Sequence, residues 1–228
     1  MLRKALLGFA GLAATVGTAF GETYPDRAPL DQYAMPSRDA EIALARSAAP
    51  ASISDDAEIL VLGARGYETA VKGKNGFTCL VLRSWTAGFE DPVFWNPKVR
   101  GPACLNAAAV RSVLPHNLER AEWVLSGISR SEMLDRTKAE IASHRYVMPE
   151  PGAMCFMMAK GQYLSDDGSH HWHPHVMFYI SDAHKTDWGF DAKGSPVIAG
   201  PMAPEPVTIF MVPVGTWSDG TPESMEMK

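Results

Sequence analysis

The feature that most constrains the fold is a block of helix-forming sequence between two groups of strand-like segments. Residues 106–144 carry helix start and stop signals, whereas residues 58–82 and 153–212 contain short apolar runs rich in β-branched and aromatic side chains. Helical and extended segments that are segregated in this way are typical of α+β proteins. The sequence therefore predicts an α+β fold, with a mostly antiparallel sheet of about six strands and helices inserted in the middle of the chain.

The expected strands are short and bounded by turn residues. Asn75-Gly76 is a hairpin signal, because both residues tolerate positive φ. The stretch 85–103 is rich in aromatic residues and prolines, and we expect it to be irregular. Its aromatic side chains either close one end of the core or belong to a functional loop. The six predicted strands are residues 58–62, 67–72, 77–82, 153–159, 173–181 and 207–212.

Capping residues mark the expected helix starts. The clearest is Ser129 with Glu132 three residues later, which together form a capping box. A side-chain oxygen at such a position accepts a hydrogen bond from a free backbone N–H of the first turn. The other expected caps, each before a further predicted helix, are Ser37, Asn106 and Asn117.

The N-terminus has the layout of a secretory signal peptide. A short basic start precedes residues 5–20, which carry no charge, and Ala19 and Gly21 place small residues at a cleavage site. The uncharged run is shorter than the ~20 residues of a membrane-spanning helix. We therefore expect residues 1–21 to be a signal peptide cleaved near Gly21, and residues 22–228 to form a single α+β domain that is periplasmic or secreted.

Charge and hydropathy exclude two classes of partner. The chain has a formal net charge of −5, and loss of its basic N-terminal segment makes the mature part more acidic. An acidic protein has no general electrostatic attraction to nucleic acid or anionic lipid. No later apolar run approaches the length of a membrane span. We expect neither a nucleic-acid partner nor an integral membrane span in the mature chain.

The three cysteines fit an oxidising compartment, where a disulfide persists. Cys79 lies in a strand-like run and Cys104 shortly before a helix signal, so a bridge between them would close the aromatic-rich stretch. An odd number of cysteines leaves one thiol over. We predict a Cys79–Cys104 disulfide and expect Cys155, which lies in an apolar run, to be a buried thiol rather than a nucleophile.

A histidine cluster is the strongest candidate for chemistry. Alternate side chains of a strand share a face, so His171, His173 and His175 would point the same way. Alternate Cα atoms are about 6.6 Å apart, so two of these rings can reach one metal ion, and a third only if the backbone bends. Pro174 favours an edge strand or a bulge. Nitrogen ligands suit zinc or copper, and the methionines in neighbouring runs would suit Cu(I).

Three functional interpretations remain open. The first is an exported binding or accessory protein with a transition-metal site at the histidines. The second is a metal-dependent hydrolase that uses the same histidines and a bound water, and the third is a structural secreted domain without a small ligand. Motifs for a serine nucleophile elbow, a phosphate-binding loop and an HExxH zinc helix are absent from the sequence. The sequence does not decide whether the protein is an enzyme.

Two segments carry a resemblance to other proteins. Residues 75–81 (NGFTCLV) and 171–175 (HWHPH) resemble a group of exported bacterial hypothetical proteins, and the similarity extends over about residues 42–218. The resemblance implies a bacterial periplasmic or secreted location. It implies no catalytic activity.

Overall fold

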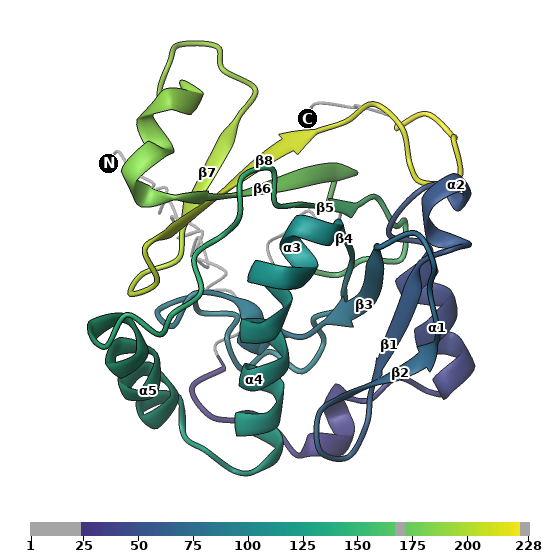
Figure 1. Ribbon diagram of the computed structural model, residues 1–228. Coiled ribbons are helices and arrows are strands. Elements are labelled where there is room, and N and C mark those ends of the chain that lie inside the picture. Colours follow the sequence, from purple (N-terminus) through teal and green to yellow (C-terminus); the bar gives the residue numbers. More distant parts are fainter. Residues whose placement is uncertain (1–23, 167–171, 224–228) are drawn as a thin grey trace, which may run out of the picture.

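A single eight-stranded sheet forms the centre of the computed structural model, which describes residues 24–166 and 172–223 (Figure 1). The strand order is β2-β1-β3-β4-β5-β6-β8-β7. All neighbouring strands are antiparallel except β1 and β3. The α+β class is as predicted, and both halves of the chain contribute to one sheet. The strands are β1 (Glu58–Leu62), β2 (Tyr67–Val71), β3 (Thr78–Leu82), β4 (Gly101–Leu105), β5 (Met154–Met157), β6 (His175–Ser181), β7 (Ile198–Pro201) and β8 (Val207–Pro213).

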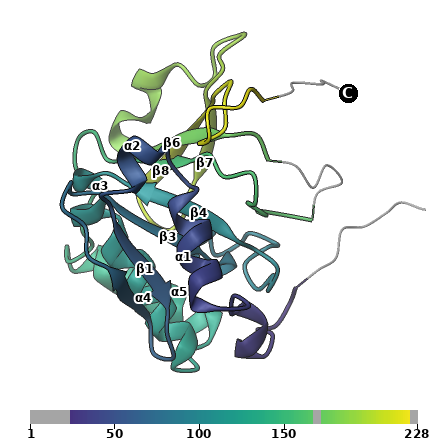
Figure 2. The same cartoon turned by 90° about the vertical axis from the view of Figure 1, so that its right-hand side faces the viewer.

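Helices cover both faces of the sheet. Figure 2 shows α1 on the near side of β1 and β3, with α4 beyond them. The α-helices are α1 (Arg38–Arg46), α2 (Ala51–Ser54), α3 (Ala107–Ser112), α4 (Leu114–Leu125) and α5 (Arg130–Ala142). Three short 3-10 helices complete the elements: η1 (Leu30–Tyr33), η2 (Ser84–Thr86) and η3 (Asp182–Trp188). None of the helices in the described parts of the chain is long and apolar enough to cross a membrane. The predicted signal peptide, residues 1–21, lies outside the described residues.

Three of the four expected helix caps are confirmed. The side chains of Ser37, Asn106 and Ser129 each accept a hydrogen bond from the backbone N–H three residues later. The fourth expectation was wrong, because α4 begins at Leu114 and not after Asn117. Pro115 lies in the first turn of α4, where its missing N–H would have no intrahelical partner in any case.

Two strands, β4 and β7, were not predicted from the sequence. β4 falls in the stretch expected to be irregular and contains Pro102. Pro102 pairs with β3, and the pairing of β4 with β5 begins only at Cys104, so the proline occupies a locally unpaired edge. β7 is a four-residue edge strand that ends in Pro201. The sheet is therefore larger than the six strands predicted, and it is mixed.

The disulfide prediction is confirmed. Cys79 and Cys104 lie directly opposite each other on β3 and β4 and are bridged. Both belong to the core cluster beneath α1, together with Ala45 and Ile59. Cys155 is a free, buried thiol, as expected. The bridge therefore joins two central strands of the sheet.

The aromatic side chains of residues 85–95 close one end of the core. Trp85, Phe89, Phe94 and Trp95 are all at most 4% exposed. They pack with Tyr33 and with residues of α4 and α5. The core-closing interpretation is thus confirmed for the side chains of this stretch.

A buried ion pair attaches α1 to the sheet. Arg83 is fully buried and donates from Nη2 to Glu41 Oε1 at 2.9 Å. Its Nε donates to the Tyr33 carbonyl at 2.7 Å, and Glu41 also accepts from the Leu62 N–H at 3.1 Å. A buried charge needs such a full set of partners. This network fixes α1 and the segment before it against β1 and β3.

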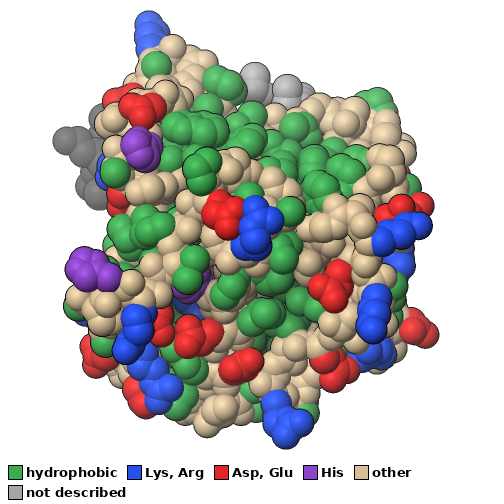
Figure 3. All heavy atoms as spheres, in the orientation of Figure 1, with side chains coloured by type: hydrophobic (Ala, Val, Ile, Leu, Met, Phe, Trp, Pro, Cys, Tyr) green, Lys and Arg blue, Asp and Glu red, His purple; other side chains and the backbone are tan. Residues whose placement is uncertain are grey.

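Aromatic side chains also cover the strands at the other end of the sheet. Trp188 stacks on Phe210 with ring centroids 5.3 Å apart, and it contacts Phe178 at 5.2 Å. Figure 3 shows hydrophobic side chains gathered on the upper part of the face that it presents, whereas charged side chains dominate the lower part. The region after β6 thus shields one face of β6 and β8.

Candidate metal-binding groove

A groove of about 910 Å³ opens over the sheet face opposite α1. Its floor consists of residues from β3 to β6 and β8. Its walls include most of residues 84–93, residues 164–166 and Trp172. We call this feature the groove. The groove is large enough for a small-molecule ligand or a metal ion. Ligand sites are commonly concave and mostly apolar, with a few polar groups.

The sheet register brings one histidine and three methionines together on the groove floor. Met157 lies directly opposite His175, and Met177 lies directly opposite Met211. Directly opposed residues share a sheet face with Cβ atoms about 5 Å apart, and alternate residues of one strand share it too. All four residues line the groove. We call the four side chains the His–Met cluster: His175, Met157, Met177 and Met211.

His175, one of these four residues, has an unsatisfied ring nitrogen. The side chain is 4% exposed, and its Nδ1 lies 2.8 Å from the carbonyl oxygen of His173. A carbonyl only accepts, so Nδ1 carries the proton and Nε2 keeps its lone pair. Nε2 has no hydrogen-bond partner among the described residues. Burial lowers the pKa of His175 below its ordinary value, which keeps the imidazole neutral. Metal-binding histidines commonly have this arrangement, in which one ring nitrogen donates to a backbone carbonyl and the other keeps its lone pair for the ion.

The other predicted histidines are not brought to the groove floor. β6 begins at His175, two residues later than predicted, so His173 does not belong to the strand. The half-exposed side chain of His173 places Nδ1 3.3 Å from Glu223 Oε1. Pro174 directly precedes the strand, so it removes no hydrogen bond from β6. His171 lies outside the described residues.

Cys155 shares the sheet face of the His–Met cluster but is committed elsewhere. It lies directly opposite Met177, and its Sγ is 3.3 Å from the hydroxyl of Tyr179. Burial raises the pKa of the Cys155 thiol to about 12. A metal-binding cysteine acts as the thiolate. Cys155 does not line the groove, so we do not count it in the His–Met cluster.

The charged side chains at the groove are mainly acidic. Glu90 is exposed and Asp91 half-buried, and both line the groove. Asp166 also lines it and is held by Asn96 at 2.8 Å and by Lys98 at 3.3 Å. Carboxylates around an apolar site of low dielectric attract cations. The surroundings of the groove thus favour entry of a positively charged species.

A second set of possible metal ligands lies between α4 and α5. Ligand atoms of His116, Glu119 and Glu140 are all within 4.8 Å of one another. Nε2 of His116 lies 2.9 Å from the Val147 carbonyl, which leaves Nδ1 as its lone-pair nitrogen. Burial, and next the charge of Glu140, raise the pKa of Glu119. One imidazole and two carboxylates suit zinc rather than Cu(I).

Sequence reasoning missed most of these residues. The spacing of His116 and Glu119 is a helix-face signal, but their proximity to Glu140 depends on how α5 packs. Met157 and Met177 stand near the histidines in sequence, whereas Met211 joins them only through the pairing of β6 with β8. Comparison with protein-family models, with curated proteins and with solved structures finds no match to this chain. The chemistry of the groove is therefore argued from its own residues.

Proposed function

We propose that this chain is an exported copper(I)-binding protein whose site is the His–Met cluster. The observation that carries the proposal is the buried Nε2 of His175, a residue of the groove lining, which has no hydrogen-bond partner among the described residues. An imidazole nitrogen with thioether sulfurs around it forms a soft donor set, and soft donors select Cu(I). Export rests on the predicted signal peptide, and the Cys79–Cys104 disulfide agrees with an oxidising compartment.

The donor set distinguishes this proposal from the hydrolytic alternative. A catalytic zinc site uses nitrogen, carboxylate or thiolate ligands and keeps one position open for water. Three of the four side chains in the His–Met cluster are thioethers, which bind zinc poorly. Copper binding and transfer, rather than hydrolysis, is the chemistry that this arrangement supports.

The groove also supports an accessory role. The groove has a volume of about 910 Å³, and the His–Met cluster forms only part of its floor. A bound ion therefore remains reachable from the open side of the groove. The acidic side chains Glu90 and Asp91 favour approach of Cu⁺. Met177 and Met211 are half-buried, and their flexible side chains can follow the ion as it enters or leaves. We infer that the protein receives copper and passes it on.

The test is an anaerobic titration with Cu(I) in competition with a chromophoric Cu(I) chelator. The protein is purified after export, without a histidine tag. We expect one equivalent of Cu(I), and at least about a tenfold loss of affinity in His175→Leu and in Met177→Leu. Matched controls are His173→Leu and Met148→Leu, because His173 does not line the groove and Met148 is exposed.

Two results would contradict the proposal. One is a wild-type protein that takes up no Cu(I), and the other is a His175→Leu variant that is folded and keeps full affinity. If the purified protein contains zinc and Glu119→Gln removes that zinc, the ion is bound by His116, Glu119 and Glu140. Zinc that His175→Leu removes would instead favour the hydrolytic interpretation.

A further inference from the structure

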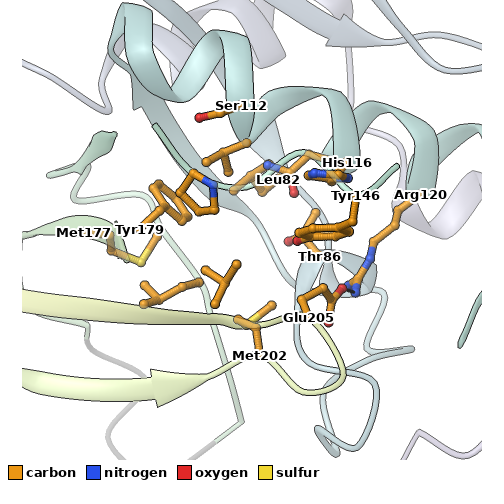
Figure 4. A pocket seen from close by; sticks show the side chains of 15 residues that line it. Leu82, Thr86, Ser112, His116, Arg120, Tyr146, Met177, Tyr179, Met202 and Glu205 are labelled. Carbon is orange, nitrogen blue, oxygen red and sulfur yellow. Dashed lines mark hydrogen bonds and ion pairs between the residues drawn. The ribbon is translucent and has the colours of Figure 1, made fainter. Parts of the chain in front are cut away.

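A second, smaller cleft lies between α3, α4 and the strands β6 and β8 (Figure 4). Its volume is about 110 Å³, which is room for several water molecules or a ligand of a few heavy atoms. Tyr146 and His116 stand on one side with their rings stacked at 4.1 Å, and Tyr179 stands on another. We call this feature the cleft. The His–Met cluster contributes only Met177 to its lining.

Arg120 is held rigidly at one end of the cleft. It is 4% exposed, and its Nη1 donates to the carbonyls of Trp85 at 3.1 Å and Ala87 at 2.8 Å. Its guanidinium lies over the ring of Phe89, 4.2 Å from the centroid. Nη2 donates to Oε1 of Glu205. The guanidinium therefore has no freedom to turn toward the second oxygen of that carboxylate.

Glu205 leaves one carboxylate oxygen unsatisfied. The residue is 6% exposed, and it approaches Arg120 from the loop between β7 and β8, as Figure 4 shows. Oε2 is buried and has no hydrogen-bond partner among the described residues. A buried acceptor without a donor costs about 1–3 kcal/mol, and more when the group is charged. Since Glu205 lines the cleft, a donor bound there would satisfy this oxygen.

The electrostatic environment of the cleft favours a cation. Arg120 is the only lysine or arginine in the described lining, and its charge is already matched by Glu205. Burial, and next the charge of Glu205, raise the pKa of the Tyr146 hydroxyl above its ordinary range. A cation bound beside Oε2 of Glu205 would therefore meet no unpaired lysine or arginine in the described lining.

We propose that the cleft binds a small primary amine, whose ammonium group donates to Oε2 of Glu205. The aromatic rings of Tyr146 and Tyr179 belong to the lining, and such rings attract a cation and pack against its short alkyl chain. Met202 and Val207 complete the apolar lining. This ligand class does not depend on copper, so the inference stands apart from the proposed function.

The experiment titrates n-butylamine hydrochloride into the exported protein and follows backbone amide shifts by NMR. We expect saturable shifts around Glu205 and Tyr146. The comparison ligands are 1-butanol, which lacks the charge, and tetramethylammonium, which lacks an N–H donor. Both should bind at least tenfold more weakly than n-butylamine.

Two variants test the location of the amine. Glu205→Gln removes the charge but keeps an oxygen for Arg120, and Asn117→Phe narrows the cleft while leaving the ion pair in place. We expect both to lose amine binding, whereas Glu90→Gln and His175→Leu in the groove retain it. The proposal is overturned if n-butylamine and 1-butanol bind equally, if no saturable shift occurs, or if amine binding survives in the folded Asn117→Phe variant.

Discussion

Nδ1 of His175 lies 2.8 Å from the carbonyl oxygen of His173, and this hydrogen bond determines which ring nitrogen keeps its lone pair. The two residues belong to one sequence motif but have different roles. His173 supplies a backbone acceptor and directs its own ring toward Glu223. His175 consequently keeps its lone pair on Nε2, and the residue shares its sheet face with the three methionines. The motif thus produces one oriented imidazole on the groove floor.

The buried pair of Arg83 and Glu41 predicts a large stability effect. Glu41→Ala leaves the fully buried Arg83 without its carboxylate, and breaking such a pair costs about 3–5 kcal/mol. Chemical denaturation should show this loss in the free energy of unfolding. The matched control is Glu68→Ala, whose pair with Arg38 is exposed, so its loss should stay below about 1 kcal/mol. Equal losses in the two variants would refute the structural role given to Arg83.

The disulfide predicts a stability change without a change in metal binding. Cys79 and Cys104 are 25 residues apart in sequence, and a bridge closing a loop of this size contributes about 3 kcal/mol. A Cys79→Ala/Cys104→Ala double variant should lose about this much unfolding free energy. Neither cysteine lines the groove, so Cu(I) affinity should be unchanged while the variant is folded. A disulfide-free variant with unaltered stability would contradict the expectation.

Asp166 predicts a stability difference that depends on pH. Burial alone would raise the pKa of Asp166, but hydrogen bonds from Tyr163, Tyr24 and Lys98 outweigh it and lower this pKa. A carboxyl whose pKa is lower in the folded state stabilises the fold above its unfolded value of about 3.9 and loses that effect as pH falls through the folded value. Asp166→Asn should therefore lower the melting temperature at pH 7, and the gap should shrink below about pH 4. A gap that is constant with pH would show that the charge contributes nothing.

The general fold could be predicted because its signals are local. Caps at Ser37, Asn106 and Ser129 act within one turn of helix, and apolar runs mark most of the strands. β4 could not be predicted in this way, because Pro102 is tolerated only through the unequal lengths of the neighbouring pairings. The lengths of these pairings are determined only when the sheet assembles.

The candidate site was predictable only in part, because it is made by strand register. The histidine motif identified His175 as a metal ligand, and the nearby methionines suggested Cu(I) as the bound ion. The position of Met211 beside Met177 follows from the pairing of β6 with β8, two strands that are separated by η3 and β7 in the chain. The pair of Glu205 and Arg120 likewise joins residues 85 positions apart. Such long-range contacts leave no local pattern.

The central claim is that Cu(I) is bound by one imidazole and by thioethers of the His–Met cluster. X-ray absorption at the copper K-edge of the Cu(I)-loaded protein tests this claim most directly, since it distinguishes sulfur from nitrogen and oxygen neighbours of the ion. The account predicts a Cu(I) edge with sulfur and one imidazole in the first coordination shell, and loss of the imidazole contribution in His175→Leu. A first shell of nitrogen and oxygen alone, or one that is unchanged in His175→Leu, would contradict it.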